Sequence, residues 1–278
     1  YWGDFQWREC PADPTQPWPV HPLGDIGNIE TTRLCDLDGD GIPEVVPNTP
    51  PQAVQVFKLG TDGRGRGTGR FTRHVLKDAP SGHGLGFGDI AGHGRTDLVL
   101  ADGWLEAPAR PWDEPWIFHP EFKLGSASVP ILVVDVNGDG LNDLIVGQAH
   151  DYGLDWYEQR RTAAGGRTWI KHAIDPHHSQ FHDLQWADLD GDGRPELITG
   201  KRFRAHCGHD PGEFDDLGIY YYKWTGGSFA KNIITCGPPG EGAGCGIHFA
   251  LADLRGTGRL DLVAPGKDGL HVFFNEGI

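Results

Sequence analysis

The chain has 278 residues and a formal net charge of −15, with 42 glycines, 21 prolines, ten tryptophans, thirteen phenylalanines and no methionine. The acidic balance argues against nucleic acid as a partner, and no apolar run reaches the roughly 18 residues of a membrane-inserted helix. The charge fits either a cation-binding protein or a solvated acidic surface, and the many turn-forming and aromatic residues favour short strands over long helices.

The N-terminal segment, residues 1–23, is predicted to form two strands, within "YWGDFQWREC" and "WPVHPL". These strands carry no acidic loop of the kind that marks the rest of the chain. They are therefore expected to close or complete a blade. Either "WPVHPL" completes the last blade of a ring, or both strands end a blade whose first part is absent.

An acidic loop then recurs along the chain, first as "CDLDGDGIPEVV", later as "VDVNGDGLNDLIVG" and "ADLDGDGRPELITG". Two further copies, "GDIAGHGRTDLVLADG" and "ADLRGTGRLDLVAPG", keep only the first and last carboxylates. The first aspartates of the five copies, at positions 36, 89, 135, 188 and 253, are separated by 53, 46, 53 and 65 residues. A period near fifty within β-type sequence is typical of a propeller blade.

Each repeat has the same order of predicted elements: a short apolar strand, the acidic loop, a second strand, an aromatic strand such as "AVQVFKL" or "GIYYYKW", and a fourth such as "TWIKHAI". The alternation and β-branched content fit strands. The sequence therefore predicts an all-β protein, a single β-propeller domain of four-stranded blades over residues 1–278. Five repeats are visible, so the ring is either five-bladed or part of a seven-bladed ring.

Oxygen-bearing side chains occupy positions 1, 3, 5 and 9 of the three complete loops. Calcium takes six to eight oxygen ligands at about 2.3–2.6 Å, and alternate residues of a tight loop can direct oxygens inward. Flanking strands and a last carboxylate at position 9 exclude an EF-hand. Three calcium ions are therefore expected, and the predicted ligands are Asp36, Asp38, Asp40 and Glu44; Asp135, Asn137, Asp139 and Asp143; and Asp188, Asp190, Asp192 and Glu196.

These D-x-D-G-D-G-x-x-D/E loops resemble the FG-GAP/VCBS repeats of integrin-type β-propellers. The resemblance implies that the calcium ions are structural and join the first two strands of a blade. Longer stretches, such as "HSQFHDLQWADLDGDGRPELITGKRF", are similar to the propellers of sugar lyases and dehydratases. That group includes rhamnose–glucuronate lyases, ulvan lyases and aldos-2-ulose dehydratase.

The antiparallel order of a blade also predicts which residues surround the central funnel. Residues shortly before each first strand and just after each second strand lie at the ends opposite the acidic loops. The predicted catalytic residues are His83, His182, His248, Arg202 and Lys201, and the predicted substrate-binding residues are Trp104, His150, Glu30 and Gln148.

Histidine titrates near neutral pH and can act as a base, and arginine binds carboxylates. These residue types suit β-elimination from a uronate-containing sugar, in which a base removes the proton beside the carboxylate and a cation neutralises the developing charge. Alternatively, three neutral imidazoles hold Zn²⁺ or another divalent metal in the funnel.

The sequence thus predicts an extracellular lyase or dehydratase that acts on a polysaccharide or oligosaccharide. Its active site is expected on a propeller that calcium ions stabilise. The alternative is a lectin or adhesin that binds sugar or protein without catalysis. Cys207, Cys236 and Cys245 lie in or beside loops, so either two of them form a disulfide, as in secreted proteins, or all five cysteines are free.

Overall fold

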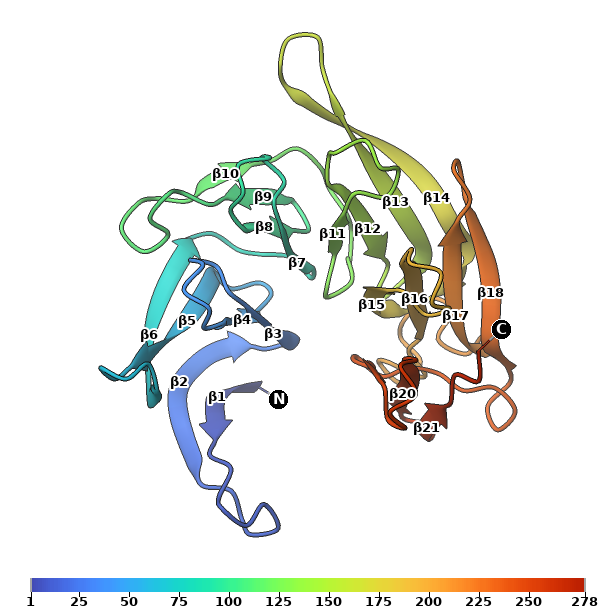
Figure 1. Cartoon of the computed structure of the whole chain (residues 1–278), viewed down its shortest axis with the longest axis horizontal. Helices are drawn as coiled ribbons and strands as arrows, with labels where there is room; N and C mark the ends of the chain where they lie inside the picture. Colours follow the sequence, from blue (N-terminus) through green and yellow to red (C-terminus); the bar gives the residue numbers. More distant parts are fainter. Residues whose placement is uncertain (1, 278) are drawn as a thin grey trace.

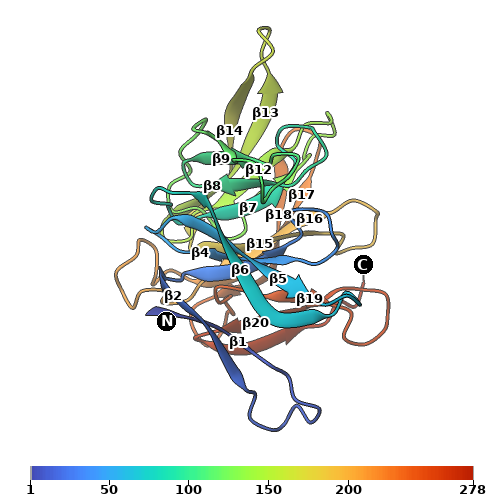
Figure 2. The ribbon, with the colours of Figure 1, turned by 90° about the vertical axis from the view of Figure 1, so that its left-hand side faces the viewer.

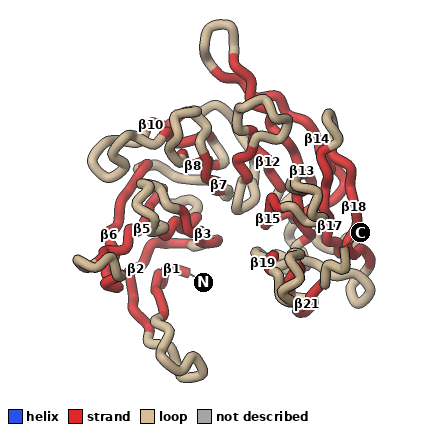
Figure 3. The backbone as a smooth tube through the Cα atoms, viewed as in Figure 1, coloured by secondary structure: helices blue, strands red, loops and turns tan. Residues whose placement is uncertain are grey.

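The computed structural model describes residues 2–277, and every regular element within that range is a β-strand (Figure 3). Four sheets have four strands each, in simple antiparallel order from the inside to the outside. Blade 1 consists of β3 (Thr31–Cys35), β4 (Glu44–Asn48), β5 (Val54–Thr61) and β6 (Gly67–Lys77). Blade 2 consists of β7 (Leu85–Gly88), β8 (Asp97–Leu100), β9 (Gly103–Glu106) and β10 (Ile117–His119).

Blade 3 consists of β11 (Leu132–Val134), β12 (Asp143–Gly147), β13 (Tyr152–Arg161) and β14 (Arg167–Ser179). Blade 4 consists of β15 (Phe181–Ala187), β16 (Glu196–Lys201), β17 (Leu217–Trp224) and β18 (Phe229–Gly237). Blade 5 has three strands, β19 (Ala250–Ala252), β20 (Asp261–Gly266) and β21 (Gly269–Phe273). The predicted all-β class and five-bladed β-propeller are confirmed (Figure 1).

The N-terminal strands β1 (Trp2–Arg8) and β2 (Val20–Asn28) form a separate two-stranded sheet beside blade 1 (Figure 1). Phe5 and Ile26 of this hairpin are buried against Phe57 of blade 1, and the rings of Phe5 and Phe57 are 4.6 Å apart. β2 pairs with β1, and no strand within residues 2–277 pairs with the outer edge of β21. The hairpin is therefore held by apolar packing on the first blade.

Apolar side chains that lie between neighbouring blades hold the ring together. Leu85 and Leu98 of blade 2 pack with Val46 and Val56 of blade 1, and comparable clusters fill the next three junctions. Full burial of each such side chain contributes about 1.5–3 kcal/mol. The alternating strand pattern places these side chains on both faces of a sheet, so blades 2, 3 and 4 each pack against both neighbours.

Each acidic loop connects the first strand of a blade to the second. In the loop between β3 and β4, the Asp36 carboxylate accepts hydrogen bonds from the amides of Gly39 and Gly41, at 2.8 and 2.9 Å. Both glycines have positive φ, +75° and +84°, a conformation that favours glycine over other residues. The loops therefore lie at one end of the blades, and the residues before each first strand lie at the other. Figure 2 shows the ring from the side, with the β13–β14 hairpin projecting from it.

All five cysteines are free in the structure, so no disulfide joins Cys207, Cys236 or Cys245. Cys245 is fully buried and Cys35 is partly buried, whereas the other three are exposed. Within the described part of the chain, no helix has the length and apolar character needed to cross a membrane.

Candidate metal centre at the propeller axis

Five side chains from four blades meet near the axis, at the ends of the strands opposite the acidic loops. Three belong to the start of a first strand or the residues before it, and two follow a second strand. The first group is Glu30 before β3, His83 before β7 and His182 in β15, and the second group is His150 after β12 and Arg202 after β16. We call these five residues the axial cluster.

One carboxylate oxygen, Oε1 of Glu30, lies at the centre of this cluster. It is 3.5 Å from Nε2 of His83, 3.5 Å from Nε2 of His182 and 3.7 Å from Nη1 of Arg202. The ring centroids of His83 and His150 are 4.6 Å apart, and those of His83 and His182 are 5.1 Å apart. These nitrogen–oxygen separations exceed the usual hydrogen-bond range of about 2.7–3.2 Å, so the groups face one another without bonding directly.

Several buried nitrogens of the cluster have no hydrogen-bond partner among the described residues. His182 is completely buried, and neither of its ring nitrogens is bonded. His83 donates from Nδ1 to the carbonyl of Ala127 at 2.7 Å, which leaves an unbonded lone pair on Nε2 facing Glu30. Leaving a buried polar atom unpaired costs about 1–3 kcal/mol. Such atoms are expected where a ligand supplies the missing partner.

The third imidazole, His150, is oriented by a carboxylate. Its Nδ1 lies 3.0 Å from Oδ2 of Asp210 and 3.1 Å from Nη2 of Arg202. Its ring also stacks on His206, whose Nδ1 is 3.0 Å from the other oxygen of Asp210. A carboxylate that holds one imidazole nitrogen leaves the opposite nitrogen free for a metal or a proton.

The electrostatics favour neutral imidazoles beside an ionised carboxylate. Burial lowers the pKa of His182 to about 4 and also lowers the pKa of His150. At neutral pH His182 and His150 therefore present imidazole lone pairs beside the Glu30 carboxylate, and these are the forms that bind divalent metals.

The donor set also has suitable dimensions for a metal. One ligand atom from each of Glu30, His83, His150 and His182 lies within 4.8 Å of all the others. Two ligands that are each about 2.1 Å from a tetrahedral Zn²⁺ are separated by about 3.4 Å, close to the 3.5 Å between Glu30 and each of two imidazoles. The residues present therefore fit a divalent metal such as zinc.

A cavity adjoins this cluster. It has a volume of about 470 Å³ and is lined by Arg202 and Phe203 of blade 4 and by His248 and Lys267 of blade 5. Arg202 is thus shared between the axial cluster and the cavity wall. Its guanidinium stays charged when buried, so an anionic group in this cavity would meet a positive charge beside Glu30 and the imidazoles.

His248 does not join the axial cluster, although the sequence predicts it there. Its Nδ1 lies 2.8 Å from Oδ2 of Asp183 and 3.0 Å from Nη1 of Arg33. Arg33 extends from blade 1 across the axis, where it bonds Asp183 at 2.6 Å and the carbonyl of Val129. Neither Arg33 nor Asp183 was among the predicted site residues. The available signal was a charge inside a predicted first strand, in "TTRLC" and "FHDLQW".

Three other predicted site residues also lie outside the cluster because packing directs them elsewhere. Lys201 is buried and its ammonium contacts Ser179 and the carbonyl of Gly212. Gln148 donates to the carbonyl of Leu124 at 2.8 Å. Trp104 is 1% exposed, stacks on His119 and lies under the guanidinium of Arg167, so its ring offers no face to a sugar.

Two tryptophans of the Pro-rich segment that follows Trp104 also have structural contacts. Trp112 donates its indole N–H to Asp38 of the first acidic loop and packs against His74. Trp116 is buried and donates to the carbonyl of Pro111. The Pro-rich segment between β9 and β10 therefore supports blade 2 and its neighbour rather than the funnel.

The predicted calcium loops differ in how well they fit a metal. All three carry the oxygen donors that Ca²⁺ prefers. In the first and the fourth, however, a lysine ammonium already contacts those oxygens: Lys58 in blade 1 and Lys223 in blade 4. In the third, no basic side chain within residues 2–277 forms an ion pair with Asp135, Asp139 or Asp143. Carboxylate oxygens of the first and fourth loops lie close enough together to hold a metal ion, but a lysine ammonium contacts them there. The third loop has no such cation among residues 2–277.

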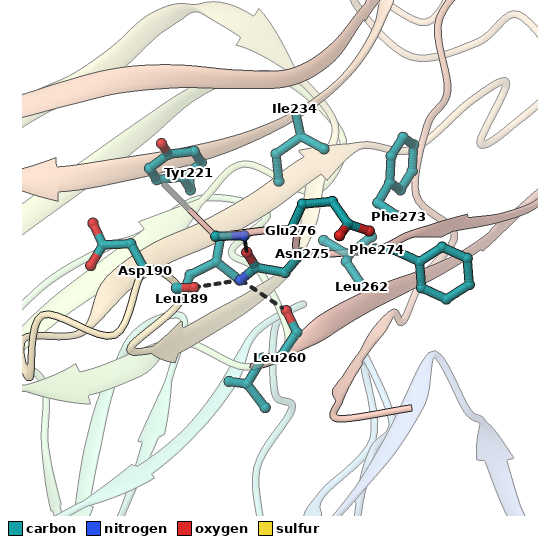
Figure 4. Close-up of a pocket in the computed structure, with 11 residues that line it drawn as sticks. Leu189, Asp190, Tyr221, Ile234, Leu260, Leu262, Phe273, Phe274, Asn275 and Glu276 are labelled. Carbon is teal, nitrogen blue, oxygen red and sulfur yellow. Dashed lines mark hydrogen bonds between the residues drawn. The ribbon is translucent and has the colours of Figure 1, made fainter. Parts of the chain in front are cut away.

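A separate pocket of about 200 Å³ lies between blades 4 and 5, away from the axial cluster (Figure 4). Leu262 and Phe273 contribute apolar surface, and Asn275 donates to the carbonyls of Leu189 and Leu260 at 2.6 and 3.4 Å. The bond to Leu189 ties the end of the described chain to blade 4, and the bond to Leu260 lies within blade 5.

Comparison with known proteins agrees with this architecture. Residues 135–199, from the third acidic loop to β16, match the FG-GAP-like repeat. The chain is therefore a five-bladed β-propeller that contains an FG-GAP-like repeat.

Over its whole length the chain is 23% identical to aldos-2-ulose dehydratase of Phanerodontia chrysosporium, and it covers 34% of that protein. The chain thus spans about a third of the length of this curated relative. Among solved structures, the V. cholerae biofilm matrix protein Bap1 matches with a TM-score of 0.38 and 20% identity, over 80% of this chain and 30% of Bap1.

Proposed function

We propose that this propeller catalyses β-elimination on a sugar, as a carbohydrate-active lyase or dehydratase, and that the axial cluster is its active site. The observation that carries the proposal is the set of buried, unbonded imidazole nitrogens around Glu30, next to a cavity that Arg202 lines. The similarity to a protein named aldos-2-ulose dehydratase supports the same reaction class.

The reaction requires a base that removes a proton from the carbon next to a carbonyl or carboxylate. The electron pair of that C–H bond forms a C=C bond, and the C–O bond to the leaving group breaks with its electrons. A neutral imidazole suits the first task. His83 and His150 each have one nitrogen held by another group, at 2.7 Å from Ala127 O and 3.0 Å from Asp210, so the opposite nitrogen can accept the proton.

Negative charge develops on the carbonyl or carboxylate oxygen as the proton leaves. Arg202 is positioned to bind that oxygen, since it lines the cavity and lies 3.7 Å from Glu30. A fixed cation in a buried site stabilises such charge more strongly than solvent does. Alternatively, Glu30, His83, His150 and His182 would hold a divalent ion such as Zn²⁺. In that case the free imidazole nitrogens would be metal ligands rather than bases, and the bound ion would supply the Lewis acidity that polarises a substrate oxygen.

The substrate class follows from the same groups. A sugar with a carboxylate or a keto group suits Arg202 and the imidazoles, and the open cavity suits an oligosaccharide or the end of a polysaccharide chain. We further propose an extracellular location, which agrees with a polymeric sugar as substrate.

The test is direct assay of elimination. The purified chain, with Zn²⁺ added, is incubated with rhamnose- and glucuronate-containing polysaccharides and, separately, with a 2-keto-aldose. We expect ultraviolet absorbance from the new C=C conjugated to a carbonyl. Arg202→Gln should reduce the rate by about a hundredfold, equivalent to about 3 kcal/mol.

A matched control is Arg110→Gln, because the Arg110 side chain is 67% exposed and pairs with Glu114 at the surface. This variant should keep the parental rate. A parent protein that retains these sugars on a column yet never forms unsaturated products would contradict the proposal and support the lectin alternative.

A further inference from the structure

Blades 1, 3 and 4 place the same strand position over their acidic loops, but the residue there differs. The second and third strands pair at Val45 with Phe57, Leu144 with Tyr157 and Leu197 with Tyr222. In each blade the next residue of the third strand lies above the loop. That residue is Lys58 in blade 1, Glu158 in blade 3 and Lys223 in blade 4.

In blade 1 the lysine occupies the centre of the loop's oxygen donors. Nζ of Lys58 is 2.7 Å from Asp38, 2.8 Å from Asp40 and 2.9 Å from Glu44. Calcium would need the same oxygens at about 2.3–2.6 Å. An ammonium and a divalent ion cannot both be bound there, because they would occupy one position and repel each other.

Blade 4 repeats this arrangement. Nζ of Lys223 bonds Asp190 and lies 3.6 Å from Asp192 and 3.9 Å from Glu196. The two incomplete loops also have basic side chains of their own. His93 contacts Asp89 at 3.4 Å and Asp97 at 3.3 Å in blade 2, and Arg255 bonds Asp261 at 3.2 Å in blade 5.

The loop of blade 3 has the opposite charge pattern. Glu158 replaces the lysine, and its Oε1 accepts from Nδ2 of Asn137 at 3.4 Å. The basic groups near this loop, Arg160 and His172, bond Glu158 at 3.0 and 2.9 Å rather than the loop carboxylates. Asp135, Asp139 and the fully buried Asp143 thus carry negative charge with no ion-pair partner within residues 2–277.

We infer that Lys58 and Lys223 are built-in counter-ions that replace the metal in the loops of blades 1 and 4, so that only the loop of blade 3 takes calcium. Each lysine does what a bound ion does in a metal loop: it cancels the repulsion among the carboxylates and joins them to the third strand. Its effective concentration is set by the fold, so those two loops stay neutralised when calcium is scarce. This inference is independent of the proposed elimination reaction.

The test is the calcium stoichiometry of the chelator-treated chain, measured by titration calorimetry and by terbium luminescence. We expect one ion per chain rather than three. Asp139→Asn should weaken that binding by about tenfold or more, equivalent to about 1.4 kcal/mol. The matched variants Asp40→Asn and Asp192→Asn change the same position of the other two loops and should leave both stoichiometry and affinity unchanged.

Removal of a counter-ion gives the converse test. Lys58→Gln should raise the stoichiometry to two, and Lys58→Gln with Lys223→Gln should raise it to three, with folding checked by circular dichroism in calcium. Three ions bound by the parent, no ion bound by the parent, or a folded Lys58→Gln chain that still binds one ion would each overturn the inference. If the lysine variants do not fold, the three aspartate variants decide the question.

Discussion

The acidic loops and the axial cluster lie at opposite ends of the same blades. They differ in whether their polar groups have hydrogen-bond or ion-pair partners within the chain. In the loops, carboxylates are bonded by backbone amides, and in four blades a basic side chain of the same blade contacts them. In the axial cluster, both nitrogens of His182 and one of His83 have no partner in the described structure. Polar groups bonded within the chain stabilise the fold, whereas buried groups left unbonded are available to a ligand.

The two regions also differ in how their charges are balanced. The first loop achieves neutrality without a ligand, because Lys58 reaches three carboxylates. The axial cluster has one carboxylate for three imidazoles and a guanidinium, and burial lowers the pKa of His182 to about 4.

The largest effect is expected where a bonded charge pair borders the axial cluster. Arg33→Met would leave Asp183, whose side chain is 1% exposed, without its arginine at 2.6 Å. Loss of one partner of a buried ion pair costs roughly 3–5 kcal/mol of unfolding free energy. Urea denaturation measures this loss. Arg110→Met removes an exposed ion pair and should cost less than about 1 kcal/mol; equal losses would show that burial of the Arg33–Asp183 pair has no energetic consequence.

The next effect separates function from stability at one side chain. His182→Leu should reduce the proposed elimination rate by about a hundredfold, about 3 kcal/mol in activation free energy. Its urea midpoint should not fall, because leucine fills a similar volume and has no polar atom that needs a partner. A rate loss accompanied by several kcal/mol of lost stability would instead mean that the imidazole supports the fold.

The smallest effect concerns the counter-ion of the first loop. Lys58→Met should lower the unfolding free energy in chelator by about 2 kcal/mol, the contribution of a hydrogen bond to a charged group. Calcium should then restore stability, since a ligand that binds only the folded state stabilises it. Lys171→Met is the matched control, because Lys171 is 56% exposed and pairs with Asp155. A chain with Lys58→Met that calcium does not restabilise would contradict the replacement of metal by lysine.

The blades can be predicted from the sequence alone, because the patterns that mark them are local. Acidic loops at intervals of 46 to 65 residues and period-two strands define each blade without reference to its neighbours. The same local order predicts which residues lie at the funnel end of a blade. Glu30, His83 and His182 precede or begin first strands, while His150 and Arg202 follow second strands, and the structure brings these five together.

Which of the funnel residues face one another depends on contacts between blades, and the sequence pattern does not show these contacts. His248 has the same position in its blade as His83, yet Arg33 of blade 1 and Asp183 of blade 4 hold it away from Glu30. Lys201 precedes Arg202 directly, and successive residues of an extended chain point to opposite sides, so the lysine is buried against Ser179 instead.

The difference arises from how far apart in the chain the contacting residues are. Strand pairing and loop turns depend on residues that are close in the chain, so the sequence encodes them directly. Contacts across the axis join residues from different blades, such as Arg33 and His248, 215 positions apart. They depend on how apolar side chains set the spacing of the blades. Lys58 and Lys223, by contrast, contact the acidic loops of their own blades, 18 and 33 positions away in the chain, and their position over those loops follows from strand register.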